Sequence, residues 1–216
     1  METLIFIIEL IGTAAFSISG AAVGMRKNMD ILGITILGAV TACGGGIIRD
    51  LVIGITPPKC FQNTTYLALA IVVALLALLP SVRRRLLDEQ QMFNRVLFLM
   101  DSVGLAVFTV IGIRTAMGVS TQFSWFLLIF VGVLTGTGGG VMRDLFAGET
   151  PYIFVKHIYA TASMAGAVCY LILHRFCNEY IAILVSIALI FVIRCLSAKY
   201  KWNLPKASLE METSDQ

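Results

Sequence analysis

Two glycine triplets, each followed by an arginine–aspartate pair, are the residues of this chain best suited to chemistry inside a membrane. Both sets lie within strongly apolar stretches. Each glycine weakens a helix interior by about 1 kcal/mol relative to alanine, and ionisable side chains at membrane depth usually mark a path for something polar. The first set is Gly44, Gly45, Gly46, Arg49 and Asp50, and the second is Gly138, Gly139, Gly140, Arg143 and Asp144. The pattern predicts a polar pathway through a membrane protein.

Two interpretations of the glycine triplets compete. Small residues let helix backbones approach closely, so the triplets could serve helix packing alone. Alternatively, each triplet kinks or breaks its helix and turns main-chain carbonyls toward an interior path, which is tolerated where protein or water lines that path. Carbonyl oxygens can replace part of the hydration shell of a cation. We favour the kinked or broken helix.

The charged residues also allow two interpretations. Adjacent residues on a helix point about 100° apart, so Arg49 and Asp50 are not expected to pair with each other. The pairs either fasten helices together as an ion-pair network or line the mouths of a polar path, and the two roles are compatible. Arg114 is a lone arginine that either snorkels to the headgroups or acts as a gate that repels cations.

The elements that carry these residues are predicted to be membrane-spanning helices. The chain is 58% hydrophobic and 13% charged, with a mean hydropathy of +0.88, whereas soluble domains are roughly 25% charged. Apolar runs near the roughly 20 residues needed to cross a bilayer occur at 4–24, 31–53, 66–80, 96–117, 123–145, 158–173 and 180–197. We therefore expect an all-α integral membrane protein with seven transmembrane helices in a single domain (1–204), followed by a short polar tail (205–216).

The distribution of basic residues predicts the orientation. Counting loops alternately, eleven lysines and arginines fall on one side, and only Lys59 and Arg175 fall on the other. By the positive-inside rule the C-terminus is cytoplasmic and the N-terminus external, in the cell (inner) membrane. The net charge of +3 thus reflects topology and attraction to membrane lipids, and it does not indicate nucleic acid.

The two glycine sets belong to an internal repeat. Residues 38–57 match 132–151 at eleven of twenty positions. Repeat one (4–80) and repeat two (96–173) each hold three predicted spans. The odd number means that the second copy enters from the opposite face, giving an inverted three-plus-three repeat plus one extra C-terminal helix, 180–197.

The inverted arrangement places charges by depth. Each half of the membrane receives one arginine and two carboxylates, formally one negative charge in excess. The external group is Glu9, Arg49 and Asp50, and the cytoplasmic group is Asp101, Arg143 and Asp144. Arg114 breaks this symmetry, because its counterpart in repeat one is Ala22.

Signals for enzyme chemistry are weak in this sequence. His157 and His174 are the only histidines and form no metal-binding spacing. No phosphate-binding G-x-x-x-x-G-K-[ST] loop occurs. We therefore expect no enzyme activity, no resident metal and no cofactor.

Seven predicted spans, a three-plus-three inverted repeat and paired G-G-G-x-x-R-D motifs resemble the prokaryotic branch of the trimeric intracellular cation channel family. The resemblance covers residues 4–197. It implies a homotrimer with a pore inside each protomer, and potassium as the main permeant cation, with sodium less favoured. It also implies that the second and fifth helices kink at Gly44–Gly46 and Gly138–Gly140 to form the pore, and that Arg114 matches a gating residue.

Two other function classes stay open at this stage. The same sequence family includes proteins described as glycine transporters, and Arg49 or Arg143 could hold the carboxylate of such a substrate. A membrane-bound structural or assembly protein would use the intramembrane charges only as fasteners.

Overall fold

The fold of the chain is helical wherever the structure, a computed structural model, describes it. The described residues are 2–87, 89–155 and 158–202, and all the regular elements in them are helices. The predicted tail, 205–216, lies outside the described residues.

In the part of the chain that the structure describes, five helices are long and apolar enough to cross a membrane. They are α1 (Glu2–Arg26), α2 (Ile31–Val52), α6 (Gln90–Val119), α7 (Trp125–Phe146) and α10 (Glu179–Lys199). Each coincides with a predicted span, because a continuous apolar run of this length is a strong signal. The all-α membrane class is therefore confirmed.

The other two predicted spans are helical but shorter. α4 (Thr65–Ala77) is followed by α5 (Pro80–Leu87) after a bend of 79°, and the two together give at most a sixth span. α9 (Ala160–Phe176) has 17 residues. Two helices of four residues, α3 (Lys59–Gln62) and α8 (Tyr152–Val155), were not predicted.

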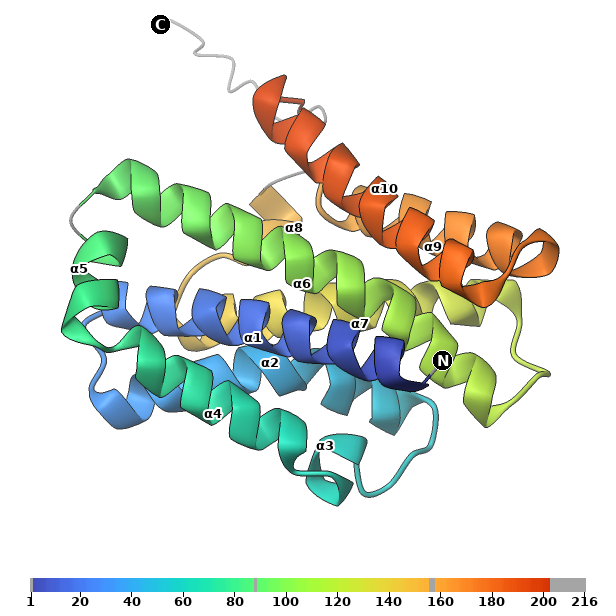
Figure 1. Cartoon of the computed structure of the whole chain (residues 1–216), viewed down its shortest axis with the longest axis horizontal. Helices are drawn as coiled ribbons and strands as arrows, with labels where there is room; N and C mark the ends of the chain where they lie inside the picture. The colour runs from blue at the N-terminus through green and yellow to red at the C-terminus, as the bar shows by residue number, and fades with distance from the viewer. Residues whose placement is uncertain (1, 88, 156–157, 203–216) are drawn as a thin grey trace, which may run out of the picture.

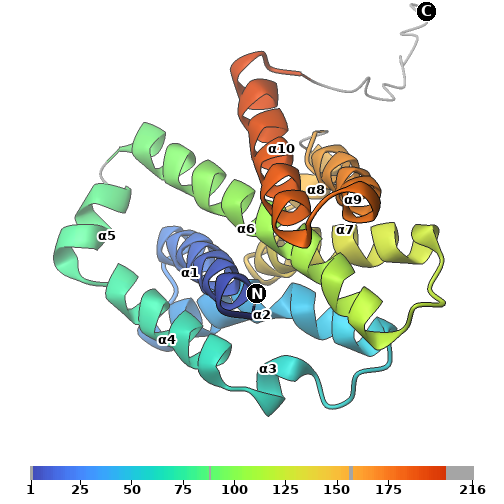
Figure 2. The ribbon, with the colours of Figure 1, turned by 45° about the vertical axis from the view of Figure 1, so that its right-hand side comes forward.

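The helices α2, α4, α6 and α7 contact α1. Figure 2 shows α1 between α4 and α6, with α2 packed along its other side. α10 and α9 lie together beyond α6, on the side away from α4 (Figure 1). α2 packs against α7, and α1 against α6, so the contacts between the two repeats run through the middle of the molecule.

The ends of α2 and α7 follow one local design. Asp30 and Ser124 accept hydrogen bonds from main-chain amides of the first turn, which satisfies donors that a helix start leaves free. At the other end, Gly54 (φ +80°) and Gly148 (φ +68°) adopt the left-handed conformation that ends a helix at little cost to glycine. The chain therefore leaves both helices in the same way, toward α3 and α8.

The glycine triplets lie inside uninterrupted helices. α2 continues from Ile31 to Val52 and α7 from Trp125 to Phe146, so the predicted break of the main chain is not found. A Cβ atom on Gly45 would lie 2.2 Å from the carbonyl oxygen of Thr135, and one on Gly139 would lie 2.2 Å from that of Thr41. The central glycines thus allow α2 and α7 to cross in backbone contact.

Candidate functional site

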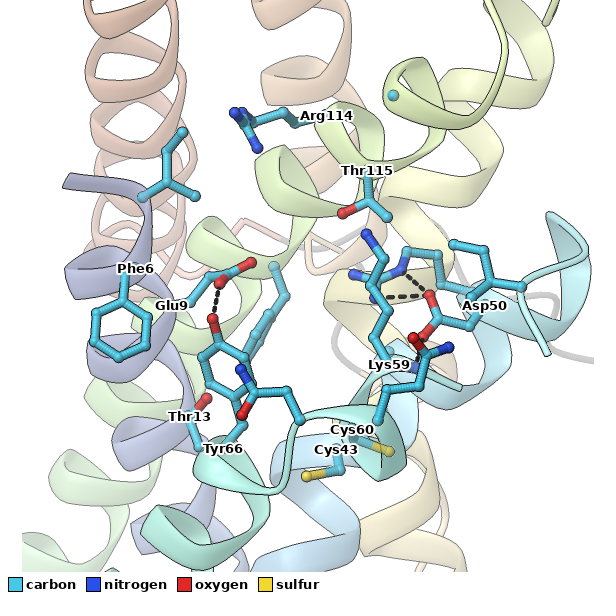
Figure 3. Close-up of a pocket in the computed structure, with 18 of the residues that line it drawn as sticks. Phe6, Glu9, Thr13, Cys43, Asp50, Lys59, Cys60, Tyr66, Arg114 and Thr115 are labelled. Atoms are coloured by element: carbon cyan, nitrogen blue, oxygen red, sulfur yellow. Dashed lines mark hydrogen bonds and ion pairs between the residues drawn. The ribbon is translucent and has the colours of Figure 1, made fainter. Parts of the chain in front are cut away.

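A cavity of about 930 Å³ brings together the charged residues predicted for repeat one. It is lined by parts of α1, α2, α3, α4 and α6, and we call it the large cavity. Figure 3 shows Glu9 and Tyr66 on one wall, Asp50 and Lys59 on the facing wall and Arg114 at one end. Its charged lining residues are Glu2, Glu9, Arg49, Asp50, Lys59 and Arg114. Of the first triplet, Gly46 lines this cavity, while Gly45 packs against α7.

Arg49 and Asp50 pair with each other, contrary to the sequence prediction. Nε of Arg49 donates to Oδ1 of Asp50 at 2.9 Å, and Nη2 lies 2.8 Å from the same oxygen. The other oxygen, Oδ2, accepts from the main-chain amide of Lys59 at 2.7 Å. Although the two Cα–Cβ bonds diverge, the long arginine side chain folds back far enough to meet the carboxylate. Asp50 therefore joins α2 to the start of α3.

The second pair repeats this arrangement. Nε of Arg143 donates to Oδ1 of Asp144 at 2.8 Å, and Nη2 lies 2.8 Å from that oxygen without the angle of a hydrogen bond. Oδ2 of Asp144 accepts from the amide of Tyr152, the first residue of α8, at 2.9 Å. Each repeat thus uses its aspartate to hold a short helix against the end of a long one.

A tyrosine accompanies the first-helix carboxylate of each repeat. The Tyr66 hydroxyl donates to Glu9, and the Tyr159 hydroxyl donates to Oδ1 of Asp101 at 3.3 Å. Glu9 and Asp101 are counterparts in the two repeats. Tyr66 lies at the start of α4 and Tyr159 directly before α9, so each tyrosine belongs to the third predicted span of its repeat. These tyrosines were not among the predicted site residues, although each follows the glycine triplet of its repeat at the same distance to within one residue.

The carboxylate of repeat two lies in a denser network, which we call the Arg143 cluster. Nη1 of Arg143 donates to Oδ1 of Asp101 at 2.8 Å and to the Ser19 hydroxyl at 2.5 Å. Nη2 of Arg194 lies 3.7 Å from Oδ2 of Asp101. Arg143 is 0% exposed and Arg194 is 4% exposed. The cluster consists of Asp101, Asp144, Arg143, Arg194, Ser19 and Tyr159.

The charge of the Arg143 cluster differs from the prediction. The sequence predicts one surplus carboxylate in this half, because Arg194, near the end of the last span, is one of the eleven basic residues assigned to the cytoplasmic side. The structure buries Arg194 against Asp101. Two arginines then face two aspartates, so the cluster is formally neutral. Neutrality is expected here, because an uncompensated charge is costly to bury.

Arg114 is paired rather than alone. Nε donates to Oε1 of Glu179 at 2.9 Å, and Nη2 lies 3.6 Å from Oε1 of Glu2. Its side chain is 29% exposed and lines the large cavity. Glu179 is the first residue of α10, so this pair joins α6 to α10.

A second cavity, of about 250 Å³, lies on the other side of the Arg143 cluster. α1 orders the arrangement: Glu9 and Thr13 line the large cavity, Phe16 and Ser19 are buried, and Val23 lines the second cavity. The ten residues from Thr13 to Val23 rise by roughly 15 Å along a helix.

Phe16 and Phe108 form an aromatic pair at the large cavity. The two rings lie 5.3 Å apart between centroids. Phe108 lines the large cavity, whereas Phe16 is 1% exposed. We call this aromatic pair together with the Arg143 cluster the barrier.

Comparison with known proteins places this architecture in a family. The family model described as "Glycine transporter" matches residues 6–81 and again 98–175. A UPF0126 membrane protein of Deinococcus radiodurans is 43% identical over 162 residues, which cover 74% of this chain and 72% of that protein. The UPF0126 membrane protein YvgT of Bacillus subtilis is 34% identical over 208 residues, or 95% of this chain and 98% of the relative.

Solved structures give the same family. The TRIC trimeric intracellular cation channel orthologue from Rhodobacter sphaeroides is 34% identical and superposes with a TM-score of 0.84, over 93% of this chain and 100% of that one. These sequence and structural matches agree over nearly the whole chain. The protein therefore belongs to the prokaryotic trimeric intracellular cation channel family, the group of bacterial membrane proteins to which the glycine transporter model and the UPF0126 relatives also point.

Proposed function

We propose that this protein is a channel for monovalent cations, mainly potassium and less readily sodium, with a pore inside each protomer of a homotrimer. The path runs from the large cavity, past the barrier, to the second cavity, between α1, α2, α6 and α7. The observation that carries the proposal is the large cavity itself, whose lining along α1 and α6 reaches Thr13 and Phe108. The likeness to solved TRIC cation channels supports the same function.

We further propose that the chain crosses the inner membrane seven times, as repeat one (4–80), repeat two (96–173) and the extra helix α10. Repeat two is inverted relative to repeat one, with the N-terminus external and the C-terminus cytoplasmic. The family model supports this by matching the chain twice. The Arg–Asp–amide arrangement also supports it, because it recurs at equivalent positions of both repeats.

One carboxylate of the large cavity favours cations. The lining charges balance overall, with Glu2, Glu9 and Asp50 against Arg49, Lys59 and Arg114. Within the described residues Glu9 has no ion pair, and it presents its carboxylate to the cavity (Figure 3). A carboxylate in a water-filled vestibule of low-dielectric walls raises the local concentration of cations.

The barrier has to open before an ion can pass. Arg143 occupies the space between Ser19 and Asp101, and Gly140 of the second triplet lies beside its guanidinium. We propose that conduction requires Arg143 to move off Asp101 while it keeps Asp144, in the way that Arg49 keeps Asp50.

Recording from planar bilayers tests the function. With purified protein and a potassium gradient, the reversal potential should follow the potassium equilibrium potential, and a smaller shift is expected for a sodium gradient. A reversal potential that ignores the potassium gradient would overturn the proposal.

A glycine carrier is the second candidate, favoured by the description of the family model. The large cavity offers both a carboxylate and cationic groups. Saturable uptake of labelled glycine into proteoliposomes, without single-channel currents, would replace the channel with the carrier. Currents that are unchanged by glycine would exclude it.

A further inference from the structure

Arg194 lies outside both repeats and yet reaches into the barrier. It is on α10, the helix without a counterpart, and only 4% of it is exposed. Nε donates to the Ser102 hydroxyl at 3.3 Å and Nη2 lies 3.7 Å from Oδ2 of Asp101. The guanidinium stacks over the rings of Phe98 (4.9 Å) and Tyr159 (4.8 Å). A basic residue that merely flanks a span would instead point to the headgroups.

Arg194 and Arg143 share the carboxylate of Asp101. Arg143 binds Oδ1, and Arg194 faces Oδ2. Without Arg194, two buried aspartates would face one arginine, and an uncompensated buried charge is costly. The closed barrier thus depends on a charge supplied by α10.

Repeat one shows the arrangement without such an arginine. Glu9 binds Tyr66, and within the described ranges no ion pair to Glu9 is found. Arg49 pairs with Asp50 alone, and the neighbouring space is the large cavity. The equivalent groups of repeat two are closed up, and Arg194 is the added residue that distinguishes them.

We propose that Arg194 is the positioning residue that holds the barrier shut, by keeping Asp101 in place for Arg143. The inference deepens the proposed channel function and rests on it. α10 is anchored at its opposite end by Glu179, which binds Arg114 on the same helix as Asp101. α10 therefore binds α6 at two points, through Glu179 and through Arg194. When Arg194 leaves Asp101, the barrier can open.

The test is the variant Arg194→Gln, measured in bilayers and by hydrogen–deuterium exchange of the segment around Asp101 in lipid nanodiscs. The open probability should rise by about tenfold or more, and amides around Asp101 should exchange faster. Lys199→Gln is the matched control, because it removes a basic, exposed residue of the same helix. It should leave both quantities at the wild-type values. Wild-type open probability and wild-type exchange in Arg194→Gln would overturn the proposal.

Two further variants keep the test decisive if Arg194→Gln folds poorly. Arg194→Lys retains the positive charge but loses the planar guanidinium, so we expect a smaller rise in open probability than in Arg194→Gln. The double variant Asp101→Asn/Arg194→Gln removes the carboxylate together with the arginine that faces it. Removal of Arg194 should add no further rise when Asp101 is already asparagine. Additive rises would show that Arg194 does not act through Asp101.

The exchange measurement separates this inference from the channel function. If the wild-type protein shows no potassium-dependent current but Arg194→Gln still speeds exchange around Asp101, the channel proposal fails and the positioning role of Arg194 stands. If currents follow potassium and Arg194→Gln changes neither open probability nor exchange, the channel proposal stands and the positioning role of Arg194 is wrong.

Discussion

Each arginine of the repeated pairs folds back onto the aspartate that follows it, and this local geometry has a consequence for stability. The aspartate is then saturated by a guanidinium and a main-chain amide in both repeats. Charge-assisted hydrogen bonds of this kind are among the stronger ones in proteins. The pairs therefore hold α3 and α8 in place, and they are not free to bind an ion by themselves.

Neighbouring glycines of one triplet should respond oppositely to alanine. Gly45→Ala places a Cβ 2.2 Å from the carbonyl oxygen of Thr135, which is main chain and cannot rotate away. We expect the melting temperature of the detergent-solubilised protein to fall by about 5 °C or more. Gly46→Ala meets only the flexible end of Arg49 at 3.7 Å and gains helix propensity, so its melting temperature should stay level or rise.

These two variants also decide between the interpretations of the triplets. If the triplets serve close packing, only Gly45→Ala disturbs folding. Equal melting temperatures for the two variants would contradict the packing observed between α2 and α7.

Cys60 offers a chemical probe of the large cavity. It lines that cavity, is a free thiol and lies in the short helix α3. A charged methanethiosulfonate reagent added from the external side should reduce the current, and Cys60→Ser should abolish the reduction. Protection of the current when reagent is added, or equal loss in Cys60→Ser, would contradict this assignment.

The rate of this modification should depend on pH in a defined direction. Burial, and then the nearby charge of Asp50, raise the pKa of the Cys60 thiol above its ordinary value. Because the thiolate is the reactive form, the modification rate should increase with pH and still be rising at the pH where an ordinary thiol levels off. Stopped reactions at several pH values, read by mass spectrometry, measure it.

At the scale of elements, α10, the helix outside the repeat, contacts α6 at two points, one near the end of α6 and one near its middle. Glu179 and Arg194 lie at opposite ends of α10, and their partners Arg114 and Asp101 lie along α6 in the reverse order. The antiparallel pairing fixes the position of α10 along α6. Arg114 is accordingly part of a helix contact and, by our proposal, part of the gate.

The pair between Arg114 and Glu179 predicts a matched response of both variants. Arg114→Ala and Glu179→Gln should each raise the open probability by up to about fivefold, since a partly exposed pair contributes about 1 kcal/mol at most. The swap Arg114→Glu/Glu179→Arg should return it toward the wild-type value. Arg175→Ala, which removes another exposed arginine, is the control, and unchanged currents in both single variants would discard a gating role for Arg114.

Sequence patterns predicted some elements well and others poorly, for physical reasons. The apolar runs predicted α1, α2, α6, α7 and α10, because a membrane-crossing helix must be apolar over its whole length. α3 and α8 have four residues each, too short for a helical pattern of apolar residues to show, and each is held by an aspartate on the preceding helix. A break at the triplets was wrong, because contact between α2 and α7 stabilises glycines that would weaken an isolated helix. A kink of these continuous helices stays a prediction.

The site shows the same division. Gly46, Glu9, Asp50 and Arg114 were predicted and do line the large cavity. Arg194 was missed, because a basic residue near the end of an apolar run is most often a flanking charge. Only the packing of α10 against α6 shows that it is buried.

At the scale of the whole molecule, large apolar side chains cover the outer surface. Examples are Phe126, Phe154 and Phe176, which are all strongly exposed in a single chain. Such a surface suits lipid and neighbouring subunits of the homotrimer that we propose.

A mixing experiment tests whether each protomer has its own pore. Wild-type and Cys60→Ser protomers are assembled together in known ratios and treated with saturating reagent. With one pore per protomer, the protected current should equal the fraction of Cys60→Ser protomers. A single shared pore would instead lose current far more steeply as the wild-type share rises, and single-molecule mass measurements check the trimer.

The likeness of the two tyrosine–carboxylate pairs has one more implication. Glu9 with Tyr66 and Asp101 with Tyr159 are the same chemical unit in two surroundings, one hollow and one filled. Under the channel function that we propose, repeat one is a template for the conducting form of repeat two, with Asp101 bound to its tyrosine and Arg143 to its neighbour. On that proposal, α10 makes two equivalent halves unequal, because Arg194 adds a charge to one tyrosine–carboxylate unit and none to the other.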